Sequence, residues 1–148
     1  MDINMEEYIT DRLEDQIAWY DRKASKAQSK YKTFQIVEII LAASIPLLAG
    51  YSSHTIFAII IGSFGSVIAV IESIVKLNKY HENWIEYRST CEMLRYHKYL
   101  YTTKTGPYSN TEETIDNLFV RTIETIISSE NNQWKVIHQE DKKRDKKS

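Results

Sequence analysis

The sequence predicts an all-α membrane protein, in which a two-pass transmembrane helical hairpin extends into a cytosolic helical bundle. Two apolar segments, residues 34–51 and 56–77, flank a short polar link. Both segments are apolar on nearly every side, which indicates burial in protein or in lipid. At about 1.5 Å per residue, each covers at least roughly 27 Å, close to the hydrocarbon thickness of a bilayer. We therefore expect two transmembrane helices.

The composition fits one domain built from long helices, residues 1–140. The chain of 148 residues contains only 4 glycines and 2 prolines, so little interrupts a helix outside the hairpin and one loop. A net charge of −1 gives no field that would attract nucleic acid. The single Cys91 excludes an intramolecular disulfide. No signal peptide opens the sequence, so we expect the hairpin to insert as an internal anchor.

Helical periodicity continues on both sides of the hairpin. Residues 4–33 carry an apolar stripe at steps of three or four, with no glycine or proline before the first apolar segment. Residues 78–102 are expected to continue the second transmembrane helix without a break and to carry a heptad-like, aromatic seam. A turn then precedes a last helix, 111–140, which is expected to complete a three-helix cytosolic bundle. The predicted seam residues are Leu13, Ile17, Tyr20, Tyr80, Trp84, Tyr87, Leu94 and Trp134.

The charges around the hairpin predict its orientation. Lysines occur on both outer flanks, whereas the link has no formal charge apart from His54. By the positive-inside rule, both termini face the cytosol. Pro46 is expected to kink or end the first transmembrane helix. The basic tail, residues 141–148, is expected to be structureless, and it either contacts anionic lipid or is simply solvated.

The second apolar segment carries small residues at intervals of four. Such rows let helices approach closely in lipid, either within the hairpin or between subunits. The alternative is that small residues are simply common in membrane helices and have no defined partner. The two rows are Ala58, Gly62 and Ser66, and Gly65, Ala69 and Ser73.

Glu38 and Glu72 are the most informative polar residues of the hairpin. Each lies a few residues inside one end of an apolar segment, so an antiparallel hairpin brings them to a similar depth. In an oligomer they would form an acidic ring at a pore mouth, which favours cations. The alternative is internal pairing, of Glu72 with Lys76 along the helix and of Glu38 with Gln35.

The motifs of common enzymes are missing from the sequence. There is no GxGxxG, Walker A, CxxC or HExxH pattern, and the four histidines are scattered. We therefore expect no enzymatic activity, no cofactor and no metal site.

Several short runs together resemble a known family over essentially the whole chain. They are residues 13–20, Glu38 with 45–48, residues 82–88, residues 98–101 with 106–108, and 130–131 with Trp134. The set resembles the SLATT superfamily of bacterial two-transmembrane proteins, in the branch catalogued as a domain of unknown function.

The resemblance implies a homo-oligomeric, pore-forming effector of the bacterial inner membrane in a nucleotide-signalled antiphage or conflict system. It also implies a separate nucleotide-sensing or nucleotide-synthesising partner protein, unless the bundle itself binds the signal through Arg88, Arg95 and Lys98. Two other classes stay open. One is a non-conducting membrane anchor or scaffold that recruits a partner, and the other is a soluble helical interaction protein with a buried hairpin.

Overall fold

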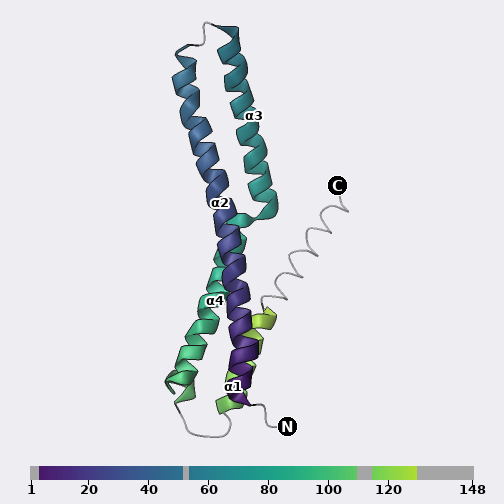
Figure 1. Cartoon of the computed structure of the whole chain (residues 1–148), viewed down its shortest axis with the longest axis vertical. Helices are drawn as coiled ribbons and strands as arrows, with labels where there is room; N and C mark the ends of the chain where they lie inside the picture. The colour runs from purple at the N-terminus through teal and green to yellow at the C-terminus, as the bar shows by residue number, and fades with distance from the viewer. Residues whose placement is uncertain (1–3, 52–53, 110–114, 130–148) are drawn as a thin grey trace, which may run out of the picture. The chain divides into compact units, whose positions relative to one another are not determined.

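The computed structural model describes residues 4–51, 54–109 and 115–129, and it is helical throughout these ranges apart from short turns (Figure 1). No strand occurs in them, which confirms the predicted all-α class. The chain divides into two compact units. We call residues 22–86 the hairpin unit, and residues 1–21 with 87–148 the bundle unit.

One helical stretch runs from Met5 to Ala49, so the N-terminal stripe continues into the first apolar segment as predicted. The Asn4 side chain caps its start by accepting a hydrogen bond of 3.1 Å from the Glu6 amide. The helix passes through Pro46 and ends three residues later. The stretch comprises α1 (Met5–Glu7), the π-helix η1 (Tyr8–Leu13) and α2 (Glu14–Ala49).

The second apolar segment forms α3 (Thr55–Asn78), but the prediction of an unbroken helix beyond it is wrong. Lys79 adopts a left-handed conformation, with φ 48° and ψ 41°, and α4 (Tyr80–Thr102) begins after it. Side-chain amides stabilise this break: Asn78 donates to the Ile74 carbonyl at 2.9 Å, and Asn83 donates to the Asn78 carbonyl at 3.0 Å. Because these bonds satisfy carbonyls at the helix end, the break needs neither glycine nor proline.

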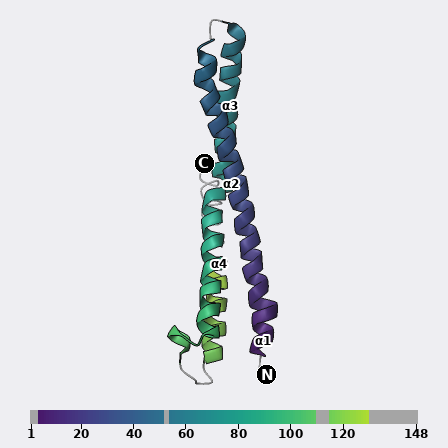
Figure 2. The same ribbon diagram turned by 60° about the vertical axis from the view of Figure 1, so that its left-hand side comes forward.

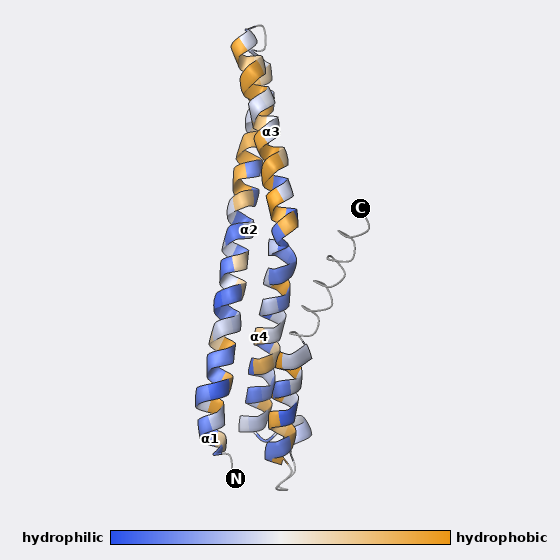
Figure 3. Ribbon diagram, turned by 90° about the vertical axis from the view of Figure 1, so that its right-hand side faces the viewer, coloured by the Kyte–Doolittle hydropathy of each residue, from blue (hydrophilic) through white to orange (hydrophobic). Residues whose placement is uncertain are grey.

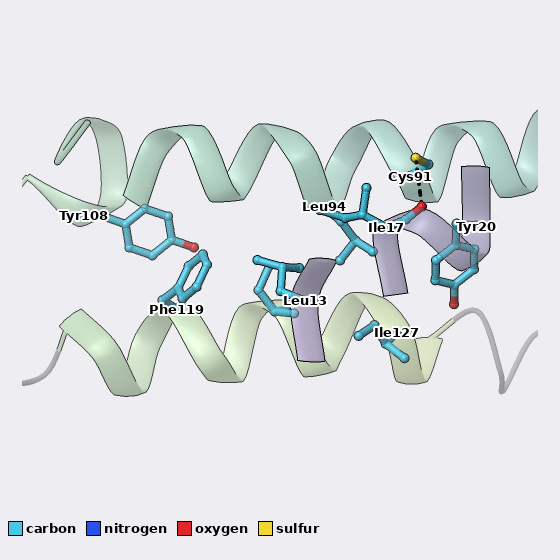
Figure 4. Packing of buried hydrophobic residues seen from close by; sticks show 9 residues of the cluster. Leu13, Ile17, Tyr20, Cys91, Leu94, Tyr108, Phe119 and Ile127 are labelled. Carbon is cyan, nitrogen blue, oxygen red and sulfur yellow. Dashed lines mark hydrogen bonds between the residues drawn. The ribbon is translucent and has the colours of Figure 1, made fainter. Parts of the chain in front are cut away.

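The bundle unit has a core shared by the N-terminal helix, α4, the short turn η2 (Gly106–Tyr108) and a helix over residues 115–129. Their buried side chains point toward one another (Figure 4). Of the predicted last helix, 111–140, only 115–129 lies within the described residues, and the basic tail lies outside them. The core residues are Leu13, Ile17, Tyr20, Cys91, Leu94, Tyr108, Phe119, Ile123 and Ile127.

A charged clamp joins the first helix of the bundle unit to the last. The Arg12 guanidinium donates two hydrogen bonds of 3.2 Å to Glu124, and the Tyr8 hydroxyl donates a third at 2.9 Å. The hydrogen bonds from Arg12 hold the pKa of the Glu124 carboxyl below its usual range. Arg12 and Tyr8 are one turn apart in η1, so one carboxylate fixes both.

Phe119 is the central ring of this core. It stacks on Tyr101 with ring centroids 4.1 Å apart and meets Tyr108 edge-on at 5.6 Å. We expect Phe119→Ala to destabilise the bundle unit by about 3–5 kcal/mol, because a fully buried aromatic ring leaves a cavity. Amide hydrogen exchange in detergent-solubilised protein measures this as faster exchange over residues 87–108.

The neighbouring Leu118 provides the control, since it is 43% exposed. Leu118→Ala should change stability by no more than about 0.5 kcal/mol. Equal effects of the two substitutions would contradict the assigned core.

His97 gives the bundle unit a pH dependence. Its Nδ1 lies 3.0 Å from the hydroxyl of Tyr108, and burial lowers the pKa of the imidazole. A lowered folded-state pKa means that the unfolded chain binds the proton more readily, so stability falls as pH drops below about 6.5. We expect the melting temperature to fall between pH 7.5 and 5.5, and to fall less in His97→Gln.

Glutamine keeps an acceptor for the Tyr108 hydroxyl but does not titrate, so the comparison isolates His97 from the other histidines. An identical pH dependence in wild type and variant would show that His97 does not carry the effect.

Candidate functional site

The hairpin unit exposes an unusual amount of apolar surface. Its two long helices contain stretches long and apolar enough to cross a membrane, and these stretches are 0% and 6% buried within the molecule. Figure 3 shows orange, hydrophobic ribbon over α3 and the second half of α2. A core helix of a soluble protein would be mostly buried, so this surface calls for lipid or a protein partner. The exposed large side chains include Ile36, Ile39, Ile40, Leu47, Ile56, Ile59, Val70 and Leu77.

Four serine hydroxyls in the apolar parts of α2 and α3 are satisfied within their own helices. Each donates to the carbonyl four residues earlier, at 2.7–3.0 Å. Such bonds leave no unmet hydroxyl donor on an apolar surface, as a helix in lipid requires. The serines are Ser44, Ser63, Ser66 and Ser73.

Large side chains, rather than small ones, face across the hairpin. Its two arms lie side by side in both views (Figures 1 and 2). Ring pairs join them at both ends: Tyr51 with Phe57 at 5.8 Å and Phe34 with Tyr80 at 6.0 Å. On α3 the less exposed residues form one stripe at helical spacing: Phe57, Ile60, Ile61, Phe64, Ile68, Ile71, Glu72 and Val75.

The two predicted small-residue rows of α3 lie on its exposed surface instead. All six residues are exposed, and a Cβ added at Gly62 or Gly65 would meet nothing within 4 Å. The rows therefore do not pack the hairpin together. Two alternatives stay open: the rows contact another subunit, or they have no defined partner. The residues are Ala58, Gly62, Ser66, Gly65, Ala69 and Ser73.

Glu38 lies on the less exposed side of α2 and is bonded along its own helix. Its Oε2 accepts a hydrogen bond of 2.9 Å from the Gln35 side chain. Its Oε1 is buried and has no hydrogen-bond partner within the described part of the chain. One half of the carboxylate is thus satisfied and the other half is not.

Glu72 is paired along α3. Its carboxylate lies 3.1 Å from the ammonium group of Lys76, and its side chain is 43% exposed. The internal pairings considered as alternatives to a pore, Glu38 with Gln35 and Glu72 with Lys76, both exist in the single chain.

The ring pairs give two counts of which residue lies opposite Glu38 in the hairpin. Four residues inward from Phe34 and Tyr80 are Glu38 and Lys76. Thirteen residues inward from the other pair, Tyr51 and Phe57, are Glu38 and Val70. Glu72 lies between these two positions in the sequence. A shared depth of the two carboxylates stays a prediction, because the two counts differ by six residues, about 9 Å along a helix.

The predicted seam is divided between the two units. The bundle core contains Leu13, Ile17, Tyr20 and Leu94, and the half-buried Tyr87 packs against it. Tyr80 and Trp84 belong to the hairpin unit, where Tyr80 contacts Phe34 and Trp84 packs on His81 at 5.8 Å. Trp134 lies outside the described residues.

The basic residues considered for phosphate binding have carboxylate partners. Arg88 pairs with Asp21 at 3.2 Å and with Glu92 at 2.7 Å. Arg95 pairs with the same two carboxylates, and Lys98 pairs with Glu14. The pairs with Asp21 and Glu14 join α2 to α4 within the bundle unit, a structural role that sequence spacing did not reveal. Within the described ranges, no group of three or more potential metal ligands occurs.

Comparison with known families gives a match over residues 15–116, which is more than two thirds of the chain. Comparisons with curated proteins and with solved structures gave no match. The matched segment includes α3, nearly all of α2 and all of α4, and therefore the whole hairpin unit with both glutamates. The chain belongs to the family described as protein of unknown function (DUF4231).

Proposed function

We propose that the protein is a homo-oligomeric, pore-forming membrane effector of a nucleotide-signalled bacterial antiphage or conflict system. The observation that carries the proposal is the hairpin itself. Its helices expose apolar side chains, bond four serine hydroxyls to their own backbone and carry one carboxylate each, Glu38 on α2 and Glu72 on α3. A purely anchoring helix has no need of ionisable groups at membrane depth, where they are costly.

In the proposed topology both termini lie in the cytosol and the hairpin crosses the bacterial inner membrane. The distribution of charge supports this orientation, because the lysines flank the open end of the hairpin while the link has no formal charge apart from His54. The polar surface and ion pairs of the bundle unit suit an aqueous compartment.

Oligomers would place Glu38 and Glu72 around a water-filled path. The Oε1 of Glu38 supports a functional role, because it is buried with no donor among the described residues, and such an oxygen needs water or a cation to satisfy it. A ring of carboxylates favours cations over anions.

The proposed link to defence rests on the resemblance to the SLATT superfamily. It implies a separate partner protein that senses or synthesises the nucleotide signal. The carboxylate partners of Arg88, Arg95 and Lys98 favour this arrangement over direct binding of a nucleotide by the bundle unit.

A non-conducting membrane scaffold is the second candidate, and the hydrogen bonds of the single chain favour it. Gln35 already serves one oxygen of Glu38, and Lys76 already neutralises Glu72. If both pairs persist in the assembled protein, the glutamates anchor the hairpin and the bundle unit recruits a partner.

Ion flux from vesicles reconstituted with purified protein separates the two candidates. We expect a protein-dependent flux that is selective for cations. Glu72→Gln and Glu38→Gln should each lower this selectivity. One carboxylate about 4 Å from an ion in water contributes about 1 kcal/mol, so each substitution should lower the cation-to-anion preference by at least roughly fivefold.

The matched control is Glu82→Gln, which removes an exposed carboxylate on α4 outside the apolar helices. Its selectivity should equal that of wild type. Unchanged selectivity in the double variant of Glu38 and Glu72 would remove these residues from the pore. No flux when the sensor and its nucleotide are supplied would favour the scaffold.

A further inference from the structure

The open end of the hairpin unit carries a compact group of aromatic and basic side chains, which we call the collar: Lys30, Tyr31, Phe34, Tyr80, His81 and Trp84. Tyr31 packs on His81 at 4.8 Å, His81 packs on Trp84 at 5.8 Å, and Phe34 stacks on Tyr80. The ammonium group of Lys30 lies over the Tyr80 ring, 5.4 Å from its centre. Aromatic residues of this kind gather at the boundary between hydrocarbon and water.

The charge around the collar has one sign on α2. Residues 22–34 contain five basic residues and no acidic residue, and all five basic side chains are exposed. Figure 3 shows the corresponding change along α2 from orange to blue ribbon. Such a surface is complementary to anions. The five residues are Arg22, Lys23, Lys26, Lys30 and Lys32.

Exposed apolar side chains lie close to the collar residues Tyr80 and Trp84 in the sequence. Leu77, in the last turn of α3, is 83% exposed, and Ile85 on α4 is 51% exposed. The left-handed Lys79 ends α3 between them, so a cation and two exposed aliphatic side chains lie within nine residues. A site for a soluble phosphate has no use for exposed aliphatic groups, whereas a phospholipid presents an anionic headgroup directly beside its acyl chains.

We propose that the collar binds the headgroups of anionic phospholipids. The lysine ammonium groups pair with the lipid phosphates, the aromatic rings lie at headgroup level, and Leu77 contacts the acyl chains. The proposal rests on the membrane-spanning hairpin of the proposed function and adds a specific lipid class and the residues that select it.

Trp84 reports directly on the lipid at the collar. The chain has 3 tryptophans, so Trp19→Phe with Trp134→Phe leaves Trp84 alone. The full-length variant is reconstituted into vesicles of equal parts phosphatidylglycerol and phosphatidylcholine, with either one brominated on its acyl chains. Bromine quenches tryptophan on contact. We expect brominated phosphatidylglycerol to occupy the site about fivefold more than brominated phosphatidylcholine.

Lys26→Gln with Lys30→Gln should bring this preference close to one. The matched control is Lys104→Gln with Arg121→Gln, which removes two exposed basic side chains of the bundle unit and should leave the preference unchanged. An equal loss in both double variants would overturn the assignment to the collar.

The outcomes distinguish the proposed lipid site at the collar from the proposal that the hairpin crosses a membrane. Equal quenching by both brominated lipids overturns the collar and leaves the hairpin in the membrane. No quenching by either lipid overturns both. Loss of the preference when inorganic phosphate replaces chloride at constant ionic strength would identify a free-phosphate site instead and overturn the assignment to lipid.

Discussion

The free-energy cost of exposing the apolar hairpin to water governs this molecule. Side chains such as Ile39, Ile56 and Leu77 are largely exposed, and each isoleucine- or leucine-sized side chain gains about 1.5–3 kcal/mol when it leaves water. Nothing in the described chain covers them. The backbone of each arm bonds within its own helix, and Ser44, Ser63, Ser66 and Ser73 donate their hydroxyl protons to that backbone, as a helix in lipid requires.

The bundle unit is stabilised by a buried core together with charge pairs on its surface. Its core is small, and charge pairs at its rim select one arrangement of three helices. The Glu124 carboxylate binds Arg12 and Tyr8 together, while Asp21 lies between Arg88 and Arg95. Exposed pairs of this kind contribute little free energy singly, but their geometry is specific. Rings at Tyr101, Tyr108 and Phe119 supply the buried area that the aliphatic residues do not.

Periodicity was sufficient to predict the helices because the long segments obey it without interruption. Residues 56–77 were expected in the second apolar helix and 55–78 form it. The break at Lys79 was missed because left-handed backbone is normally signalled by glycine, whereas here the amides of Asn78 and Asn83 stabilise it.

Side-chain partners were harder to predict than helices. Intervals of four revealed the Glu72–Lys76 pair, because both residues belong to one helix. The Arg12–Glu124 and His97–Tyr108 contacts depend on how separate segments pack, so no local pattern marks them. The rows of small residues on α3 were compatible with packing within the hairpin, with packing between subunits, or with no partner. Their exposure excludes only packing within the hairpin.

The central claim, that the hairpin crosses a membrane with both ends on one side, is tested most directly by cysteine accessibility. With the native Cys91 changed to serine, His54→Cys marks the link between the arms and Lys104→Cys marks the turn after α4. In intact spheroplasts, a membrane-impermeant maleimide should label the first variant at once and the second only after lysis. Labelling of both positions from the same side would contradict the proposed topology.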